Sequence, residues 1–127
     1  MSTLANAFSA MLNAEMRNKR ECLISPASKL LGNVLRVLQV AGYVGKFEFI
    51  DDGRFGKFDV QLLGRINKCG IIKPRCSCKV EGLEVWEKRF LPSKEFGTII
   101  LSTSRGIMSH IDAKQTQIGG FLLAFIY

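Results

Sequence analysis

Three consecutive hydroxyl side chains followed by an arginine and a glycine form the segment best equipped for chemistry. Its residues are Ser102, Thr103, Ser104, Arg105 and Gly106, and because an apolar stretch precedes them we expect a loop after a strand. Hydroxyls donate and accept hydrogen bonds, a guanidinium adds a planar fork of donors, and glycine lets backbone approach a ligand closely. Such a loop can bind phosphates, ribose hydroxyls and base edges of irregular RNA. A plain polar turn accounts for these residues equally well.

The four cysteines raise the question of a metal site. They are Cys22, Cys69, Cys76 and Cys78. Structural zinc sites pair their ligands as C-x₂₋₄-C, whereas one residue separates the closest pair here. We therefore predict reduced thiols in a reducing compartment, with no metal and no cofactor. The alternative is a different class of protein, a metal- or thiol-dependent regulator that uses Cys69, Cys76 and Cys78. The zinc content of the purified protein would distinguish the two.

An enzyme is not expected. The chain has one histidine, His110, beside a serine that resembles a helix cap, where histidine is usually a surface or structural residue. The nucleophile elbow, the P-loop and the dinucleotide-binding glycine motif are all missing from the sequence. The adjacent pair Asp51 and Asp52 falls at an expected hairpin tip, where carboxylates cap turns. We predict a non-enzymatic protein with no small-molecule substrate.

The charge balance points to a polyanionic partner. The 127 residues include 18 Lys and Arg against 11 Asp and Glu, which gives a formal charge of +7 and a pI near 9.5. Because neutralised phosphates release condensed counterions, this excess favours nucleic acid, although many basic proteins never bind it. No apolar run approaches the roughly 20 residues of a membrane helix, and the start has no secretory pattern. We expect a cytoplasmic protein without a membrane partner.

The hydrophobic periodicity predicts an α+β fold. The first half is expected to hold two helices, from Thr3 to about Lys19 and from Ser25-Pro26 to Ala41, and strands at 21–24, 43–50 and 57–62. This order gives a three-stranded sheet with two helices on one face. After a break near 64–70, the pattern becomes mostly β, with helical turns near 83–90 and after Ser109, and strands at 98–101 and 121–127.

The first helix is expected to carry a polar stripe without carboxylates opposite its apolar stripe. The stripe consists of Asn6, Ser9, Asn13 and Arg17. It could lie against phosphates, although a solvated face is the more common meaning of such a stripe. Lys29 falls in the first turn of the second helix, where the dipole disfavours a cation unless an anion docks nearby.

Many short motifs, in order along the whole chain, resemble the universal small-subunit ribosomal protein family number eight. The strongest is Ser102–Gly106 with Ile107-Met108-Ser109-His110 and then Gly119-Gly120 before an apolar strand. Earlier matches are Leu4-Ala5-Asn6-Ala7, Pro26-Ala27-Ser28-Lys29, Gly42-Tyr43-Val44-Gly45 and Asp51-Asp52-Gly53-Arg54. The archaeal and eukaryotic branch is indicated by Asn67-Lys68-Cys69-Gly70, Ile72-Lys73-Pro74-Arg75 and Arg89-Phe90-Leu91-Pro92-Ser93.

The resemblance implies an N-terminal α/β domain over about 1–64, packed on a mostly β, rRNA-binding domain over about 65–127. It also implies a structural component of the small ribosomal subunit that binds the central domain of small-subunit rRNA, supports assembly and translation, and touches neighbouring ribosomal proteins. The hydroxyl segment would contact the bulged core of an rRNA helix, with Arg105 at a variable place in the motif. Lys29 and the polar stripe would hold the RNA backbone. The chain departs from the family at two places, the segment Cys76-Ser77-Cys78 and the residue Phe121.

Overall fold

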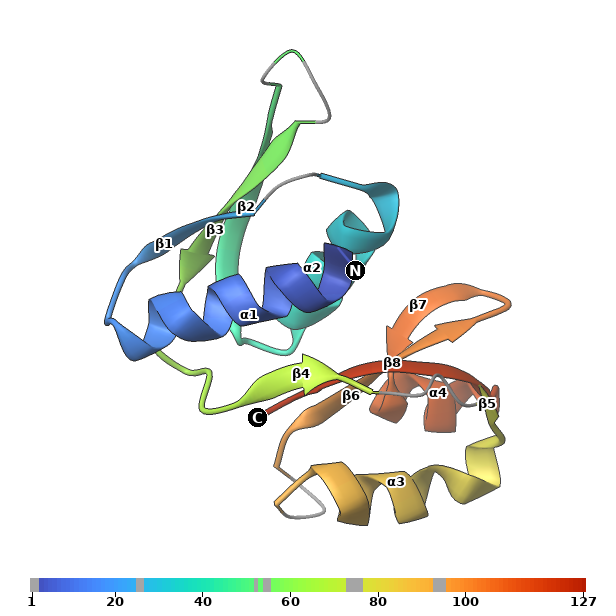
Figure 1. Ribbon diagram of the computed structural model, residues 1–127. Helices are drawn as coiled ribbons and strands as arrows, with labels where there is room; N and C mark the ends of the chain where they lie inside the picture. Colours follow the sequence, from blue (N-terminus) through green and yellow to red (C-terminus); the bar gives the residue numbers. More distant parts are fainter. Residues whose placement is uncertain (1–2, 25–26, 52, 54–55, 73–76, 93–95) are drawn as a thin grey trace. The chain divides into compact units, whose positions relative to one another are not determined.

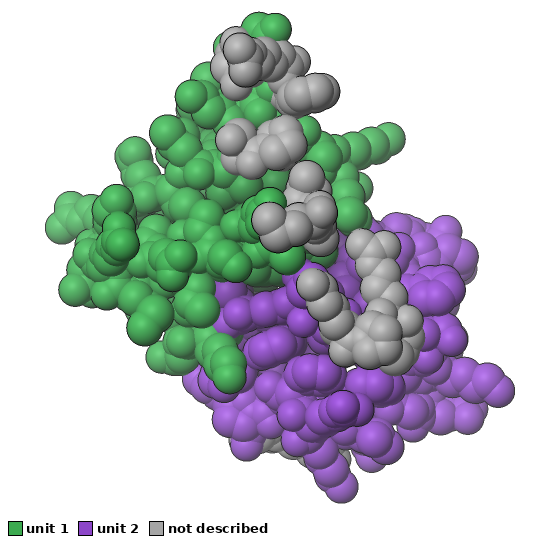
Figure 2. Space-filling model, in the orientation of Figure 1, with its two compact units in different colours: residues 1–68 green, residues 69–127 purple. Residues whose placement is uncertain are grey.

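The computed structural model describes residues 3–24, 27–51, 53, 56–72, 77–92 and 96–127 (Figure 1). The chain divides into two compact units, residues 1–68 and residues 69–127, which are coloured separately in Figure 2. The first unit has two helices and a three-stranded sheet, and the second is mostly β. The expected α+β class is confirmed.

The first unit contains α1 (Thr3–Met16), β1 (Glu21–Ile24), α2 (Lys29–Val40), β2 (Val44–Ile50) and β3 (Lys57–Leu62). Its strands are antiparallel in the order β1-β3-β2, so the strand that comes last in sequence is central. Alternate residues of β1 and β3 are buried, which gives the sheet one core face. That face holds Cys22, Ile24, Phe58, Val60 and Leu62, and it is covered by Leu4, Phe8 and Met11 of α1 and Leu31, Val34, Leu35 and Leu38 of α2.

Both helices of the first unit end in the same backbone turn. In α1 the amide of Lys19 donates to the Ala14 carbonyl and the amide of Asn18 donates to the Glu15 carbonyl, while Asn18 has a φ of 58°. This Schellman turn ends the helix at Met16, three residues before the expected end at Lys19. In α2 the amide of Tyr43 donates to the Leu38 carbonyl and the amide of Gly42 donates to the Gln39 carbonyl, while Gly42 has a φ of 88°.

The second helix begins later than expected. Ser28, not Ser25, is its N-cap, and the Ser28 hydroxyl accepts from the amide of Leu31 at 3.1 Å. A hydroxyl at this place satisfies one of the free amides of the first turn, and Ser28 offers it immediately before Lys29. Ser25 and Pro26, the expected opening of this helix, lie outside the described residues.

The second unit contains β4 (Cys69–Ile71), β5 (Ser77–Cys78), a 3₁₀ turn (Val80–Gly82), α3 (Leu83–Phe90), β6 (Thr98–Thr103), β7 (Gly106–Ser109), α4 (His110–Thr116) and β8 (Gly120–Ile126). The last strand is central: β6 pairs along one edge of it, and β4 and β5 pair with its two ends along the other. One face of this sheet forms the core with both helices of the unit. The core residues are Ile72, Cys78, Leu83, Leu91, Ile99, Leu101, Ala113 and Leu122.

Candidate nucleic-acid interface

The hydroxyl segment is a tight β-hairpin, and the prediction that all five of its residues form a loop was wrong, because the outer ones belong to strands. Ser102 and Thr103 continue β6, and Thr103 pairs with Gly106, the first residue of β7. Only Ser104 and Arg105 form the turn. Gly106 has a φ of 112°, a conformation that a side chain would strain. We call residues 102–106 the hydroxyl hairpin.

The Thr103 hydroxyl holds the turn of the hydroxyl hairpin together. It donates to the Gly106 carbonyl oxygen at 2.8 Å and accepts from the Arg105 amide at 3.1 Å. Threonine therefore has a structural role in the segment. No hydrogen bond to another described residue engages the Ser104 hydroxyl. Ser104 and Arg105 are both exposed at the tip, so their side chains are the ones presented to solvent.

Two glycines allow β8 to approach its neighbours closely beside the hairpin. A Cβ on Gly120 would lie 2.3 Å from the Ser102 carbonyl oxygen, and one on Gly119 would lie 2.3 Å from the Cys78 carbonyl oxygen. Any side chain at either place would collide with backbone. The packing of the strands thus explains the pair Gly119-Gly120. The close approach that these glycines allow holds the base of the hydroxyl hairpin against the central strand.

A buried polar cluster supports the hairpin from its second strand. His110 follows β7 directly and is 2 % exposed; its Nδ1 accepts from the Ile99 amide at 3.0 Å, and its Nε2 lies 3.3 Å from a carboxylate oxygen of Glu87. Lys114 forms an ion pair with the same oxygen. Burial lowers the pKa of His110, although the Glu87 carboxylate acts in the opposite direction. Of the two roles expected for this histidine, the structural one is correct and the surface one is wrong.

The Ser109 cap is confirmed. Its hydroxyl accepts from the amide of Asp112 at 3.2 Å and so begins α4 immediately after β7. The hairpin is therefore continuous with a capped helix, and His110, the first residue of that helix, is anchored in the core. Together these contacts leave the exposed tip on a rigid base, as a preorganised binding element requires.

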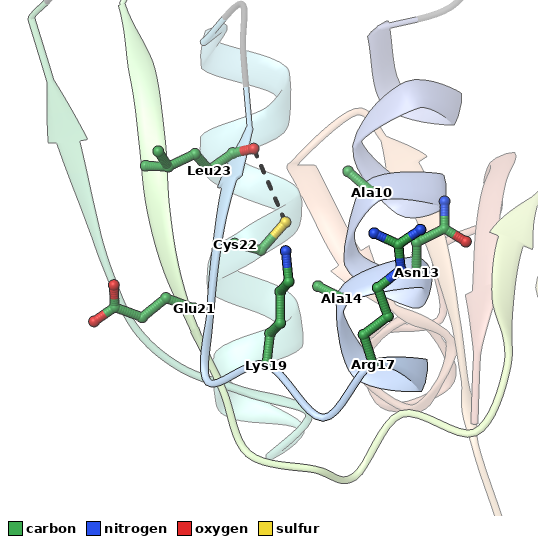
Figure 3. A pocket seen from close by; sticks show the side chains of 8 residues that line it. All are labelled: Ala10, Asn13, Ala14, Arg17, Lys19, Glu21, Cys22 and Leu23. Carbon is green, nitrogen blue, oxygen red and sulfur yellow. Dashed lines mark hydrogen bonds between the residues drawn. The ribbon is translucent and has the colours of Figure 1, made fainter.

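In the first unit, the polar stripe of α1 is exposed at Asn6, Ser9, Asn13 and Arg17, as expected. Arg17 is the residue at which α1 turns back, and cations near a helix C-terminus are favoured by the dipole. Asn13, Arg17 and Lys19 line a hollow of about 480 Å³ between the end of α1 and β1 (Figure 3). Glu21, which also lines it, points away from these cations in Figure 3.

Lys19 is a residue of this hollow that was not predicted as part of the site. The signal was present: an asparagine that can adopt the left-handed conformation stands between Arg17 and Lys19, and the resulting turn brings both cations to one hollow. Cys22 lines the same hollow, and burial raises the pKa of its thiol. The hollow can therefore hold an anion through Arg17 and Lys19, with the Asn13 amide as a further polar group.

Lys29 is exposed at the first position of α2 and belongs to a different hollow, which Ser28, Phe49 and Phe58 also line. The candidate residues thus form three separate groups: the hollow at the end of α1, the start of α2 and the hydroxyl hairpin. Asn6 lies two turns before Asn13 on the same helix and does not line the hollow.

A metal site shared by Cys69 and Cys78 is excluded by the strand register. Cys69 pairs with Ile126 and Cys78 with Gly120, which places them opposite positions six residues apart on β8, roughly 20 Å at the rise of a strand. Both thiols are buried, and among the described residues no group of three potential ligands could hold a metal. Cys76, the remaining member of the alternative considered for these cysteines, lies outside the described residues.

The arrangement defines a class: a small basic α+β protein in two units, with exposed cations on one and an exposed hydroxyl hairpin on the other. Comparison with known families gives a match to the model of "Ribosomal protein S8" over residues 2–127. The chain is also 56 % identical over 126 residues to "Small ribosomal subunit protein uS8" of Methanosphaerula palustris, an alignment covering 99 % of this chain and 97 % of the relative. The chain belongs to the ribosomal protein S8 family. Within the described residues, no helix is long and apolar enough to cross a membrane.

Proposed function

We propose that this chain is a structural component of the small ribosomal subunit, that it binds the central domain of small-subunit rRNA, and that it supports subunit assembly and translation in the cytoplasm. Its partners are the rRNA and neighbouring proteins of the subunit, and it performs no catalysis. The family match over residues 2–127 carries this proposal, because it includes the hydroxyl hairpin and both cation groups. The formal charge of +7 supports a polyanionic partner.

Within this function, the three groups of candidate residues have different roles. The hydroxyl hairpin reads the RNA through Ser104 and Arg105 at its tip and through the Ser102 hydroxyl, while Thr103 and Gly106 fix the backbone that presents them. Cations that contact phosphates supply affinity and position but carry no sequence information. Lys29, Arg17 and Lys19 have this role, and Asn6 and Asn13 add neutral donors along α1.

The hairpin assignment is tested by comparing Ser104→Ala with Thr103→Val and Thr103→Ser. Ser104→Ala removes a hydroxyl that the described part of the fold does not use, so stability should stay unchanged. Its affinity for a transcript of the rRNA central domain should fall by roughly five-fold or more, since a lost partner of a buried polar group costs about 1–3 kcal/mol. Filter binding measures the affinity, and urea unfolding measures the stability.

The threonine variants serve as the structural control. Thr103→Val removes both bonds of the turn and should reduce stability by about 1–2 kcal/mol as well as weakening binding. Thr103→Ser keeps the hydroxyl and should resemble the original protein in both measurements. Unchanged RNA affinity for Ser104→Ala would remove the hairpin tip from the interface.

A further inference from the structure

One row of side chains crosses the sheet of the second unit beside the hydroxyl hairpin. Phe121 on β8 is directly opposite Ser102 on β6 and Ser77 on β5, and Ser102 is in turn opposite Ile107 on β7. Residues paired in this way point to the same face of a sheet. Phe121 is therefore the immediate neighbour of the first hydroxyl of the hairpin.

This row lies on the face of the sheet opposite the core. The adjacent residues Cys78, Leu101 and Leu122 belong to the hydrophobic core, and strand side chains alternate between faces. Phe121 is 55 % exposed, whereas Leu122 is completely buried. Ile100 and Ala124, further along the same face, are completely buried, so Phe121 lies at the exposed end of that face, where core packing does not account for an aromatic ring.

The surroundings of the ring are mixed, with Cys78 and Val80 beside hydroxyl and charged side chains. Phe121, Ser77, Lys79, Glu81 and Gly119 all line a hollow of about 570 Å³. Among the described residues that line it, one ammonium and one carboxylate balance each other in charge. A phosphate would meet the carboxylate unfavourably, and an apolar protein surface would bury hydroxyl and charged groups without partners. A nucleobase suits it better, because a base is neutral, has a π-face and has hydrogen-bonding edges.

We propose that Phe121 is a base-stacking residue: an unpaired RNA base lies on its ring, beside Ser102, while the hydroxyl hairpin binds the adjoining RNA. This inference rests on the proposed function and names the kind of RNA that the site takes, an unstacked nucleotide rather than a continuous duplex. Stacking on an aromatic side chain contributes affinity with little dependence on the identity of the base. Ser77, Ser102 and the hollow supply polar partners for its edge.

The test compares four variants for binding to a transcript of the central domain of small-subunit rRNA, at one salt concentration. Phe121→Tyr keeps an aromatic ring and should bind within about two-fold of the original protein. Phe121→Leu keeps apolar bulk without the ring and should weaken binding roughly five-fold or more. Phe96→Leu, at another exposed aromatic of the same unit, is the matched control and should leave affinity unchanged. Ser104→Ala reports on the hairpin independently.

A spectroscopic measurement separates stacking from altered structure. With Trp86→Phe removing the single tryptophan, Phe121→Trp should show fluorescence that RNA quenches, while Phe96→Trp in the same background should not. If Phe121→Leu binds the RNA as tightly as the original protein while Ser104→Ala binds it more weakly, base stacking is overturned and the proposed function stands. An original protein that does not bind this rRNA would overturn both. Equal losses of RNA affinity in Phe121→Leu and Phe121→Tyr would also contradict stacking, because the tyrosine variant keeps an aromatic ring and should keep the affinity.

Discussion

Replacing Gly120 by alanine should test how closely the central strand must approach the hydroxyl hairpin. The new Cβ would lie 2.3 Å from the carbonyl oxygen of Ser102 and 3.0 Å from its carbonyl carbon. Both atoms are backbone of the neighbouring strand, so β6 or β8 has to move. Overpacking of this kind lowers the free energy of unfolding by about 1–3 kcal/mol, occasionally more. Alanine also restricts the unfolded chain more than glycine does, which raises the free energy of unfolding by about 0.4–1 kcal/mol. A contact of 2.3 Å with backbone falls at the upper end of the overpacking cost, about 3 kcal/mol, so we expect a net loss of about 2 kcal/mol.

Gly70→Ala is the matched control, because Gly70 lies on β4 of the same sheet and also has no positive φ. Its Cβ would meet only the ring of Phe125, at 3.3 Å, and a side chain can yield where backbone cannot. Urea unfolding followed by Trp86 fluorescence should give a change within about 1 kcal/mol for Gly70→Ala. At roughly 4 °C per kcal/mol, Gly120→Ala should also lower Tm by about 8 °C. Equal stability of the two variants would refute the close approach of the strands.

Two further predictions concern the buried histidine and the cations. Burial lowers the pKa of His110 in the folded state, so only the unfolded chain gains a proton there as pH falls through about 6.5. Below that pH the free energy of unfolding should therefore decrease, by at most about 1.4 kcal/mol per pH unit. Urea titrations at pH 7.5 and 5.5 measure this, His110→Gln should remove it, and stability that rises on acidification would contradict it. Lys29→Ala and Arg17→Ala should each weaken specific and non-specific RNA alike and reduce the slope of log affinity against log salt by about one at most. Lys46→Ala is the exposed control, and a change confined to sequence preference would argue against phosphate contacts.

The helices and strands of the first unit could largely be predicted from the sequence, because local patterns determine them. The strand at 21–24 and the one at 57–62 have the expected bounds, since alternation and turn residues mark both ends. The start of α2 was predicted too early because two serines precede Lys29, and only the hydrogen bond from the Leu31 amide identifies Ser28 as the cap. The early end of α1 depended on Asn18 adopting a left-handed conformation.

The candidate site was less predictable where its contacts join distant residues. The burial of His110 depends on Ile99 and Glu87, which are far from it in sequence, so a lone histidine beside a cap gave no sign of its partners. The hairpin at 102–106 has polar residues at strand positions, and its ends are strand because β7 and β8 pair with them. Exposed residues of α1 were easier to identify, since helical periodicity alone separates the two faces.

The carboxylate of Glu15 links the beginning of the first unit to its end. Its two oxygens accept from the amides of Gly64 and Ile66, at 3.2 and 3.1 Å, across 49 and 51 residues of sequence. At about 5–20 residues per second of synthesis, roughly 3–10 s separate Glu15 from these partners. The central strand β3 also follows both strands that it joins. The first helix made is therefore among the last elements of its unit to be locked in place, because a nascent chain shorter than 66 residues lacks one of the two amides that bind Glu15.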